Sequence, residues 1–267
     1  MKFVLTIVVV VAFFYVLVRY LEKTSIFYPA RQIEIAPDRF GLPYEDIYFT
    51  TEDGVKLNGW LVKNPSAKCT LLFFHGNAGN IGDRLLKLRF FHDLGVNTFI
   101  MDYRGYGRSQ GTPTEEGLYK DGRAAYDYLA GRQDLKNTTV VLYGGSLGGA
   151  VAIDLARHRT VHGLIIDSTF PSAPAMSQII YPMIPTFFLS VKFDSQSKVK
   201  LLTMPKLFMH SVEDRTVPIR LGKQLFEAAP GPKKFVELTG GHNDAHIDCK
   251  EKFLGAIKDF LKRNDWL

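Results

Sequence analysis

The stretch TVVLYGGSLG, residues 139–148, decides the fold class of this protein. Its first five residues are β-branched or apolar and predict a buried strand, and the alanine-rich segment behind it predicts a helix. Between them lies the pattern Gly-x-Ser-x-Gly, in which two glycines let the strand and the helix approach closely around a sharp turn. Ser146 lies at the tip of that turn, before the free N–H groups of the helix, which favour negative charge. Ser146 is therefore a candidate nucleophile.

Other glycine-rich turns would give this stretch a different role. A phosphate-binding Walker loop ends in Gly-Lys-Ser or Gly-Lys-Thr, which residues 144–149 lack. A dinucleotide-binding fingerprint needs Gly-x-Gly-x-x-Gly, but after Gly105 and Gly107 the third glycine, Gly111, comes one residue late. An ordinary turn with a serine cap on the helix is the alternative to a nucleophile.

Strand and helix patterns alternate along the rest of the chain. Apolar and polar residues alternate along residues 44–62 on both sides of an Asp53-Gly54 turn, which predicts an N-terminal β-hairpin. The short apolar runs that follow suit strands buried on both faces of a parallel sheet, and they cover residues 70–74, 98–101, 139–143, 163–166, 206–209 and 234–238. This order predicts an α/β fold with a mostly parallel, doubly wound sheet of about eight strands.

The helices between these strands carry start and stop signals. Thr112-Pro113-Thr114-Glu115 predicts a capping box with Pro113 at the first helical position, and Gly131 ends that helix. Helices are predicted over residues 84–94, 113–130, 147–157, 219–228 and 249–262.

Composition limits the function classes. The chain has 267 residues, 46% hydrophobic and 22% charged, which is a globular composition, and its two cysteines exclude a disulfide scaffold or a four-cysteine zinc site. Only Lys2 and Arg19 of the 33 basic residues precede residue 21, so the remaining 31 stand against 27 acidic residues. This mild excess predicts no nucleic-acid partner.

Residues 3–18 are apolar except for Thr6. As a helix they span about 24 Å, and residues 19–21 bring this to about 28 Å, close to the roughly 30 Å of a bilayer core. We expect a transmembrane signal-anchor at residues 1–21, a connector at 22–43 and one catalytic domain at 44–267. A cleaved signal and a buried core helix are the alternatives. Because basic residues flank both ends of the span, the side of the membrane that holds the catalytic domain is left open.

A serine nucleophile needs a general base, and the base needs an orienting carboxylate. Where a Gly-x-Ser-x-Gly turn of this type carries the nucleophile, the acid and then the base follow it along the chain. Asp214 follows the strand at 206–209 and is the expected acid, with Glu213 as the competitor. His242 follows the last strand after two glycines and is the expected base, with His246 as the competitor.

The oxyanion formed by such chemistry requires two backbone donors. The helix after Ser146 supplies the N–H of Leu147, and the loop after the strand at 70–74 supplies that of Asn77. His75, in the same loop, is expected to be a structural hydrogen-bonding residue. Residues 102–109 are expected to brace this loop, with their arginines solvated or in salt bridges.

Residues 168–202 are rich in proline and large apolar side chains and predict a small lid over the serine. A core-packing helix pair is the alternative. The candidate substrate-facing residues of the lid are Ile179, Ile180, Met183, Phe187 and Phe188.

Four motifs together resemble the membrane-anchored α/β-hydrolase-domain family, relatives of serine-aminopeptidase-type hydrolases. They are residues 75–80 (HGNAGN), 102–107 (DYRGYG), 144–149 (GGSLGG) and 240–243 (GGHN). The resemblance implies an α/β-hydrolase fold, a Ser146–Asp214–His242 triad and no metal or cofactor. Related proteins include lysophospholipid hydrolases and acyl-protein thioesterases, although many eukaryotic members have arginine where this chain has Gly145.

From the motifs and the resemblance we expect a single-pass, membrane-anchored serine hydrolase that cleaves carboxylic esters or thioesters. Its substrate would be a lipid or an acylated small molecule or protein near the membrane. The alternatives are a peptidase or amidase with the same triad and, against an intact triad, a non-catalytic binding protein. The sequence predicts no oligomeric state.

Overall fold

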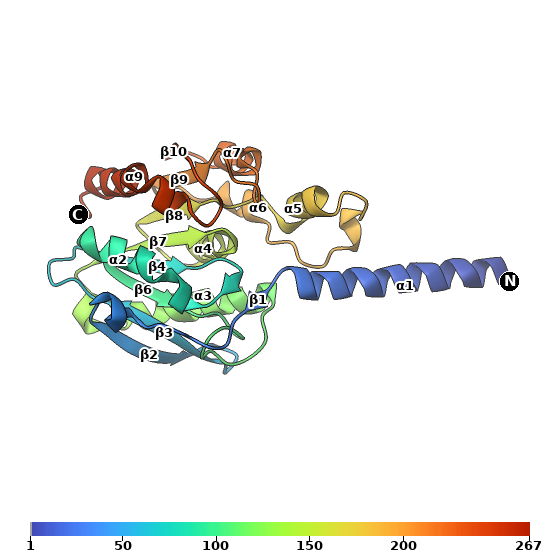
Figure 1. The fold of residues 1–267 in the computed structure, drawn as a ribbon, viewed down its shortest axis with the longest axis horizontal. Coiled ribbons are helices and arrows are strands. Elements are labelled where there is room, and N and C mark those ends of the chain that lie inside the picture. The colour runs from blue at the N-terminus through green and yellow to red at the C-terminus, as the bar shows by residue number, and fades with distance from the viewer. Residues whose placement is uncertain (1) are drawn as a thin grey trace.

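The computed structural model describes residues 2–267, and its centre is one sheet of eight strands (Figure 1). The strand order is β10-β9-β8-β7-β4-β6-β3-β2, parallel except where β3 pairs with β6 and β2. This confirms the predicted α/β fold with an N-terminal hairpin. The strands are β2 (Tyr44–Thr50), β3 (Lys56–Val62), β4 (Cys69–Phe74), β6 (Asn97–Met101), β7 (Thr139–Gly145), β8 (Gly163–Asp167), β9 (Lys206–Ser211) and β10 (Lys233–Leu238).

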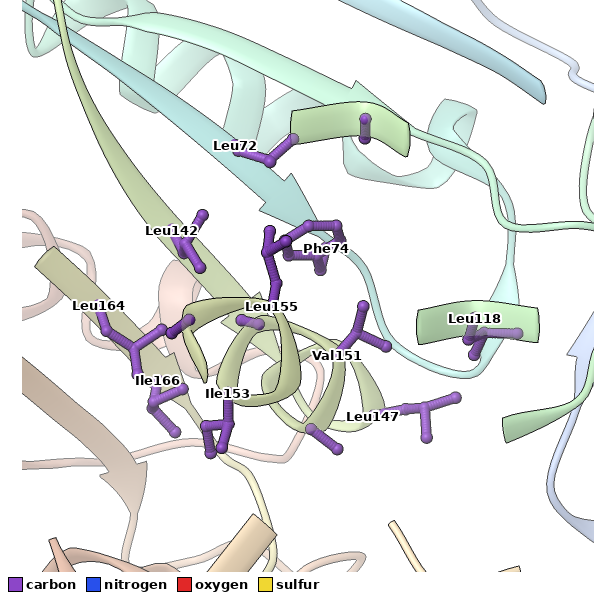
Figure 2. Packing of buried hydrophobic residues seen from close by; sticks show 14 of the residues in the cluster. Leu72, Phe74, Leu118, Leu142, Leu147, Val151, Ile153, Leu155, Leu164 and Ile166 are labelled. Carbon is purple, nitrogen blue, oxygen red and sulfur yellow. The ribbon is translucent and has the colours of Figure 1, made fainter. Parts of the chain in front are cut away.

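Helices cover both faces of the sheet. In β4, Leu72 and Phe74 pack in the cluster that contains α4, whereas Leu71 and Phe73 belong to the cluster on the opposite face. Figure 2 shows the first face, where Leu147, Val151 and other side chains of α4 approach the strands. The helices are α2 (Leu85–Asp93), α3 (Glu115–Ala130), α4 (Leu147–His158), α6 (Ser195–Val199), α7 (Ile219–Ala228), α8 (Ala245–Asp248) and α9 (Lys250–Arg263). Burial on both faces explains the unbroken apolar runs of the inner strands.

The start of α3 corrects one local prediction. Its N-cap is Thr114, whose hydroxyl accepts a hydrogen bond from the N–H of Gly117, so Pro113 lies before the helix and not at its first position. A capping box also needs a side chain at the third helical position that accepts from the backbone N–H of the N-cap residue. Gly117 occupies that position and has no such side chain, so there is no capping box.

The N-terminal helix α1 (Lys2–Ser25) extends away from the sheet as a long rod, blue in Figure 1. Residues Lys2–Tyr20 have a mean hydropathy of 2.4, and a helix this long and apolar meets the length and composition requirements of a membrane span. The predicted anchor at 1–21 includes Met1, which lies outside the described residues. Because α1 continues to Ser25, the first residues of the predicted connector are helical.

The remainder of the connector is tied to the catalytic domain. Its short strand β1 (Tyr28–Pro29) pairs in parallel with β5 (Ala78–Gly79), directly after the loop that carries Asn77. Neither strand was predicted, since two residues carry no periodic signal.

The segment 168–202 consists of two parts that pack differently. Its first part holds α5 (Ala173–Ile180), which has no fully buried residue, and the 3-10 turn Thr186–Phe188. Its second part ends in α6, whose Val199 is buried in the core beside α4 and α7. We use the name lid for residues 171–193 from here on.

Candidate active site

Ser146 occupies a strained turn between β7 and α4. Its backbone angles, φ 52° and ψ −119°, lie in a region that side-chain-bearing residues rarely adopt. A Cβ at Gly144 would lie 2.6 Å from the carbonyl oxygen of Gly148, and a Cβ at Gly148 would collide with the backbone of Phe74. The two glycines of the motif are therefore required by close backbone approach, whereas Gly145 has room for a side chain.

The three predicted residues come together at the carboxyl ends of the strands. The Nε2 of His242 lies 3.1 Å from the Oγ of Ser146, and its Nδ1 lies 2.6 Å from the Oδ2 of Asp214. The imidazole thus bridges a hydroxyl and a buried carboxylate, the arrangement in which it can take a proton from the hydroxyl.

Asp214 is held by more than His242. Its Oδ1 accepts hydrogen bonds from the N–H groups of Thr216 and Val217, and the Nε2 of His210 lies 3.3 Å from its Oδ2. Burial alone would raise the pKa of Asp214, but the hydrogen bonds from His210 and His242 outweigh it and hold that pKa well below its usual range. The carboxylate of Asp214 is therefore ionised at neutral pH.

Neither competitor reaches the reacting atoms. Glu213 accepts a hydrogen bond from the N–H of Gly240 and so supports the loop that carries His242. The ring of His246 packs near Phe90 and Phe253, and burial with the nearby charge of Lys87 lowers the pKa of His246 to about 4.

The two expected oxyanion donors lie beside the nucleophile. Asn77 and Leu147 both line the cavity that contains Ser146. Within residues 2–267, neither backbone N–H has an acceptor among the turn and cap hydrogen bonds. Leu147 is the first residue of α4, so its N–H is one of the free donors of the helix.

Residues 102–109 stabilise the loop that carries Asn77 through side-chain hydrogen bonds. Tyr106 donates its hydroxyl to the carbonyl oxygen of Asn77, and Tyr103 donates to that of His75. The His75 ring is buried between these two tyrosines, with its Nε2 3.4 Å from Asp102, so it is structural as expected. Arg104 and Arg108 form salt bridges, also as expected.

A family model described as serine aminopeptidase, S33, matches residues 65–192. The α/β-hydrolase domain-containing protein WAV2 of Arabidopsis thaliana is 34% identical over 257 residues, which cover 88% of this chain and 83% of WAV2. The chain belongs to the α/β-hydrolase domain family.

Two further relatives and a solved structure agree with this assignment. Protein bem46 of Schizosaccharomyces pombe is 37% identical over 86% of the chain and 80% of its own length. YNL320W, an uncharacterized membrane protein of Saccharomyces cerevisiae, is 35% identical over 87% of the chain and 84% of its own length. The esterase Pf2001 of Pyrococcus furiosus has the same fold, with a TM-score of 0.75 at 20% identity over 88% of this chain and 98% of the esterase.

Two cavities meet at Ser146 of this α/β hydrolase. The first, the apolar cavity, has a volume of about 180 Å³ and lies under the lid. Its walls come from the lid, from residues 216–217 and, unexpectedly, from the inner end of α1. The lining residues are Val18, Glu22, Ser25, Ile26, Asn77, Ser146, Leu147, Phe170, Ala173, Met176, Ser177, Ile180, Tyr181, Ile184, Leu189, Val191, Phe193, Thr216 and Val217.

The five predicted lid residues take different positions. Ile180 lines the apolar cavity, and Ile179 packs against the core. Met183 and Phe187 point outward, with 89% and 77% of their surfaces exposed, and Phe188 stacks against Phe14 of α1. Of the five, only Ile180 therefore lines the cavity that contains Ser146, and the substrate-facing role of the five stays a prediction. Hydrophobicity alone does not show which way a residue in a short helix or turn points.

The second cavity, the polar cavity, has a volume of about 290 Å³ and lies on the other side of Ser146. Lys87 donates to Asp167 at 2.9 Å, and this pairing holds the pKa of the buried Asp167 below its usual value although burial alone would raise it. Arg84 is different: its Nη2 donates to the carbonyl oxygen of Ala78, but its buried Nε has no partner among the described residues.

Sequence reasoning missed several supporting groups. Thr169 donates its hydroxyl to the carbonyl oxygen of Ser146 and so holds the strained turn. His210 faces the acid, and Arg84 and the Lys87–Asp167 pair line the polar cavity. Only Asp167 had a signal, a carboxylate at the end of a predicted parallel strand. Within the described part of the chain, no cluster of three metal-ligating side chains occurs.

Proposed function

We propose that this hydrolase is a membrane-anchored serine hydrolase that cleaves carboxylic esters or thioesters with apolar acyl chains. The observation that carries the proposal is the His242 ring, which lies within hydrogen-bonding distance of both the Ser146 hydroxyl and the Asp214 carboxylate. An imidazole so placed serves as a general base for an alcohol nucleophile.

In the first half of the reaction the Ser146 Oγ attacks the acyl carbonyl carbon as its proton moves to the Nε2 of His242. Asp214 accepts from the Nδ1–H, which fixes the tautomer and stabilises the imidazolium. The backbone N–H groups of Leu147 and Asn77 stabilise the tetrahedral oxyanion. His242 then donates its proton to the leaving alcohol or thiol, and the acyl group stays on Ser146.

In the second half a water molecule enters from the polar cavity once the leaving group has departed. His242 takes a proton from this water, the resulting hydroxide attacks the acyl carbonyl, and the tetrahedral intermediate collapses to release the carboxylic acid. The proton on His242 returns to the Ser146 oxygen, which restores the enzyme. Every proton in the cycle passes through one imidazole, and the cycle uses no cofactor.

The two cavities orient the substrate. The apolar cavity suits an acyl chain, because its walls are aliphatic and aromatic side chains with few polar atoms. The polar cavity suits the leaving group and the water that replaces it. The α1 helix holds the domain at the membrane, so the substrate is a lipid or an acylated molecule at the bilayer surface.

A peptidase with the same triad is the rival activity, and an aminopeptidase requires a carboxylate to bind the substrate's amino group. The acidic residue that lines the apolar cavity is Glu22. Its oxygens already accept from Ser190, Val191 and Arg19. This occupied carboxylate favours an acyl substrate over a peptide.

The proposal is tested by chain-length series on the purified full chain in phosphatidylcholine vesicles. The substrates are p-nitrophenyl esters from C2 to C16, thioesters of the same acyl groups, and amino-acid p-nitroanilides. We expect kcat/KM for esters and thioesters to rise with chain length and to exceed the anilide values by at least about 100-fold. A maximum at C2 would contradict the acyl cavity, and equal turnover of anilides would favour the peptidase.

A further inference from the structure

The inner end of α1 is built into the catalytic domain. Val18 and Glu22 are 1% and 8% exposed, whereas Val16 on the opposite face of the same helix is 63% exposed. Val18, Glu22 and Ser25 follow the i, i+4, i+7 spacing of a single helical face, and all three line the apolar cavity. One face of the inner end of α1 therefore forms part of the candidate active site, with Val18 from the predicted anchor and Glu22 and Ser25 from the predicted connector.

Glu22 connects this face of α1 to the lid by hydrogen bonds. One of its carboxylate oxygens accepts from the N–H groups of Ser190 and Val191, at 2.7 and 3.1 Å, and the other accepts from the Ser190 hydroxyl at 3.0 Å. Ser25 and Tyr181 are also in hydrogen-bonding contact, at 3.2 Å. Charge-assisted bonds to backbone donors are among the stronger hydrogen bonds, so α1 is held in a defined position against the lid.

The outer part of the lid lies at the level of the candidate membrane span. Phe188 packs edge-on against Phe14, which is six residues inside the Lys2–Tyr20 span, or about 9 Å along the helix axis. Membrane-surface helices bury their apolar faces about 5–10 Å deep, so this depth is that of the outer hydrocarbon region. Met183 and Phe187, which are exposed in the isolated protein, fit that environment.

The size of the apolar cavity indicates where a long acyl chain continues. At about 180 Å³ it is smaller than the roughly 300 Å³ at the lower limit of typical ligand pockets, so it encloses only part of such a chain. The rest must extend beyond the cavity, and one side of the cavity is lined by α1, the helix that contains the candidate membrane span.

We propose that α1 is a wall of the substrate site as well as an anchor, and that a long acyl chain enters from the bilayer between the Val18 face of α1 and the lid. This inference rests on the proposed esterase or thioesterase function. It assigns Val18 as a determinant of acyl-chain length and the surface formed by Met183 and Phe187 as a membrane contact.

The first test compares Val18→Trp with Val16→Trp, the same substitution on the lipid-facing side. The full chain is reconstituted in phosphatidylcholine vesicles, and kcat/KM is measured for p-nitrophenyl palmitate (C16) and p-nitrophenyl acetate (C2). In Val18→Trp the C16:C2 ratio should fall at least tenfold, because the indole fills the path of the chain, while Val16→Trp should keep the wild-type ratio. An unchanged ratio in Val18→Trp, or an equal fall in both variants, would overturn the inference.

If Val18→Trp does not fold, Val18→Ala provides a second test of the same position. Removing two methyl groups widens the same wall, so the preferred chain length should move upward, and no movement would count against the inference. A fluorophosphonate probe separates this outcome from failure of the proposed function. Wild-type protein that does not react with the probe at Ser146 refutes the function itself, whereas normal labelling with unaltered chain selectivity refutes only the role of α1.

The second test measures membrane depth directly. Met183→Trp should be quenched by phosphatidylcholine brominated on its acyl chains, whereas Tyr48→Trp, on β2 at the far edge of the sheet, should not (Figure 1). The two native tryptophans are at most 9% exposed and give a low background. Equal quenching of both variants, or none in Met183→Trp, would contradict entry from the bilayer.

Discussion

The apolar cavity and the polar cavity share Ser146 but have opposite chemistry. The apolar cavity is lined by α1 and the lid, and its acidic lining residue, Glu22, accepts hydrogen bonds from lid amides. The polar cavity is lined by Arg84, Lys87 and three histidines, His75, His242 and His246. Under the proposed function, this difference would let the two halves of an ester be recognised separately, the acyl part by burial and the leaving part by polar groups.

The comparison is tested first at two of the three histidines of the polar cavity, His242 and His246. His242→Gln should lower kcat by at least about 10⁵-fold, because it removes the group that takes the proton from Ser146. His246→Gln should cost less than about tenfold, since His246 has no contact with the serine. Both values come from steady-state hydrolysis of a p-nitrophenyl ester, and equal losses would contradict the assignment of the base.

The next largest effect is expected at the acid. Asp214→Asn should lower kcat by about 10⁴-fold, because the amide cannot stabilise the imidazolium and favours the wrong tautomer. The matched control is Glu213→Gln, which keeps an acceptor for the N–H of Gly240 and should retain most of the activity. A larger loss in Glu213→Gln would reverse the choice between the two carboxylates.

Asp214 also predicts a pH dependence of stability. Its pKa in the folded protein is held below that of the unfolded chain, about 3.9, so its stabilising contribution is complete above that pH and is lost as the pH falls through the folded value. The difference in free energy of unfolding between wild type and Asp214→Asn should be constant above about pH 5 and should shrink below pH 4. Urea unfolding at several pH values measures it, and a difference that grows in acid would contradict the sign.

A smaller effect is expected at Arg84. Burial lowers the pKa of this guanidinium, and its Nε lacks a partner within the described residues, so an anionic leaving group would gain a charge-assisted hydrogen bond. Arg84→Gln should lower kcat/KM about tenfold for an ester whose leaving group carries a carboxylate or phosphate. An ester with a neutral leaving group should be unaffected, and an equal loss on both would show that Arg84 is only structural.

The sequence predicted those parts of the site that depend on local geometry. The strand, the Gly-x-Ser-x-Gly turn and the helix behind it form one continuous stretch, and the acid and the base follow two neighbouring strands. Because the carboxyl ends of parallel strands meet at one edge, the sequence alone predicts that these three residues lie together.

The apolar cavity could not be predicted in the same way. On its α1 side, Glu22 contacts Ser190, which lies about 170 positions away in the sequence. In addition, nothing in the apolar run at 3–18 distinguishes a buried Val18 from an exposed Val16. The apolar composition of the lid likewise did not show that Met183 and Phe187 point outward. His210 gave no signal either, because its contact with Asp214 depends on the turn between β9 and α7.

The most direct test of the account is capture of the acyl-enzyme. The full chain in vesicles is mixed with p-nitrophenyl palmitate, quenched in acid within the first turnover, digested and analysed by mass spectrometry. The account predicts a palmitoyl group on the peptide that contains Ser146, formed together with a burst of p-nitrophenol, and neither signal in Ser146→Ala. An acyl group on another residue, or wild-type turnover by Ser146→Ala, would contradict it.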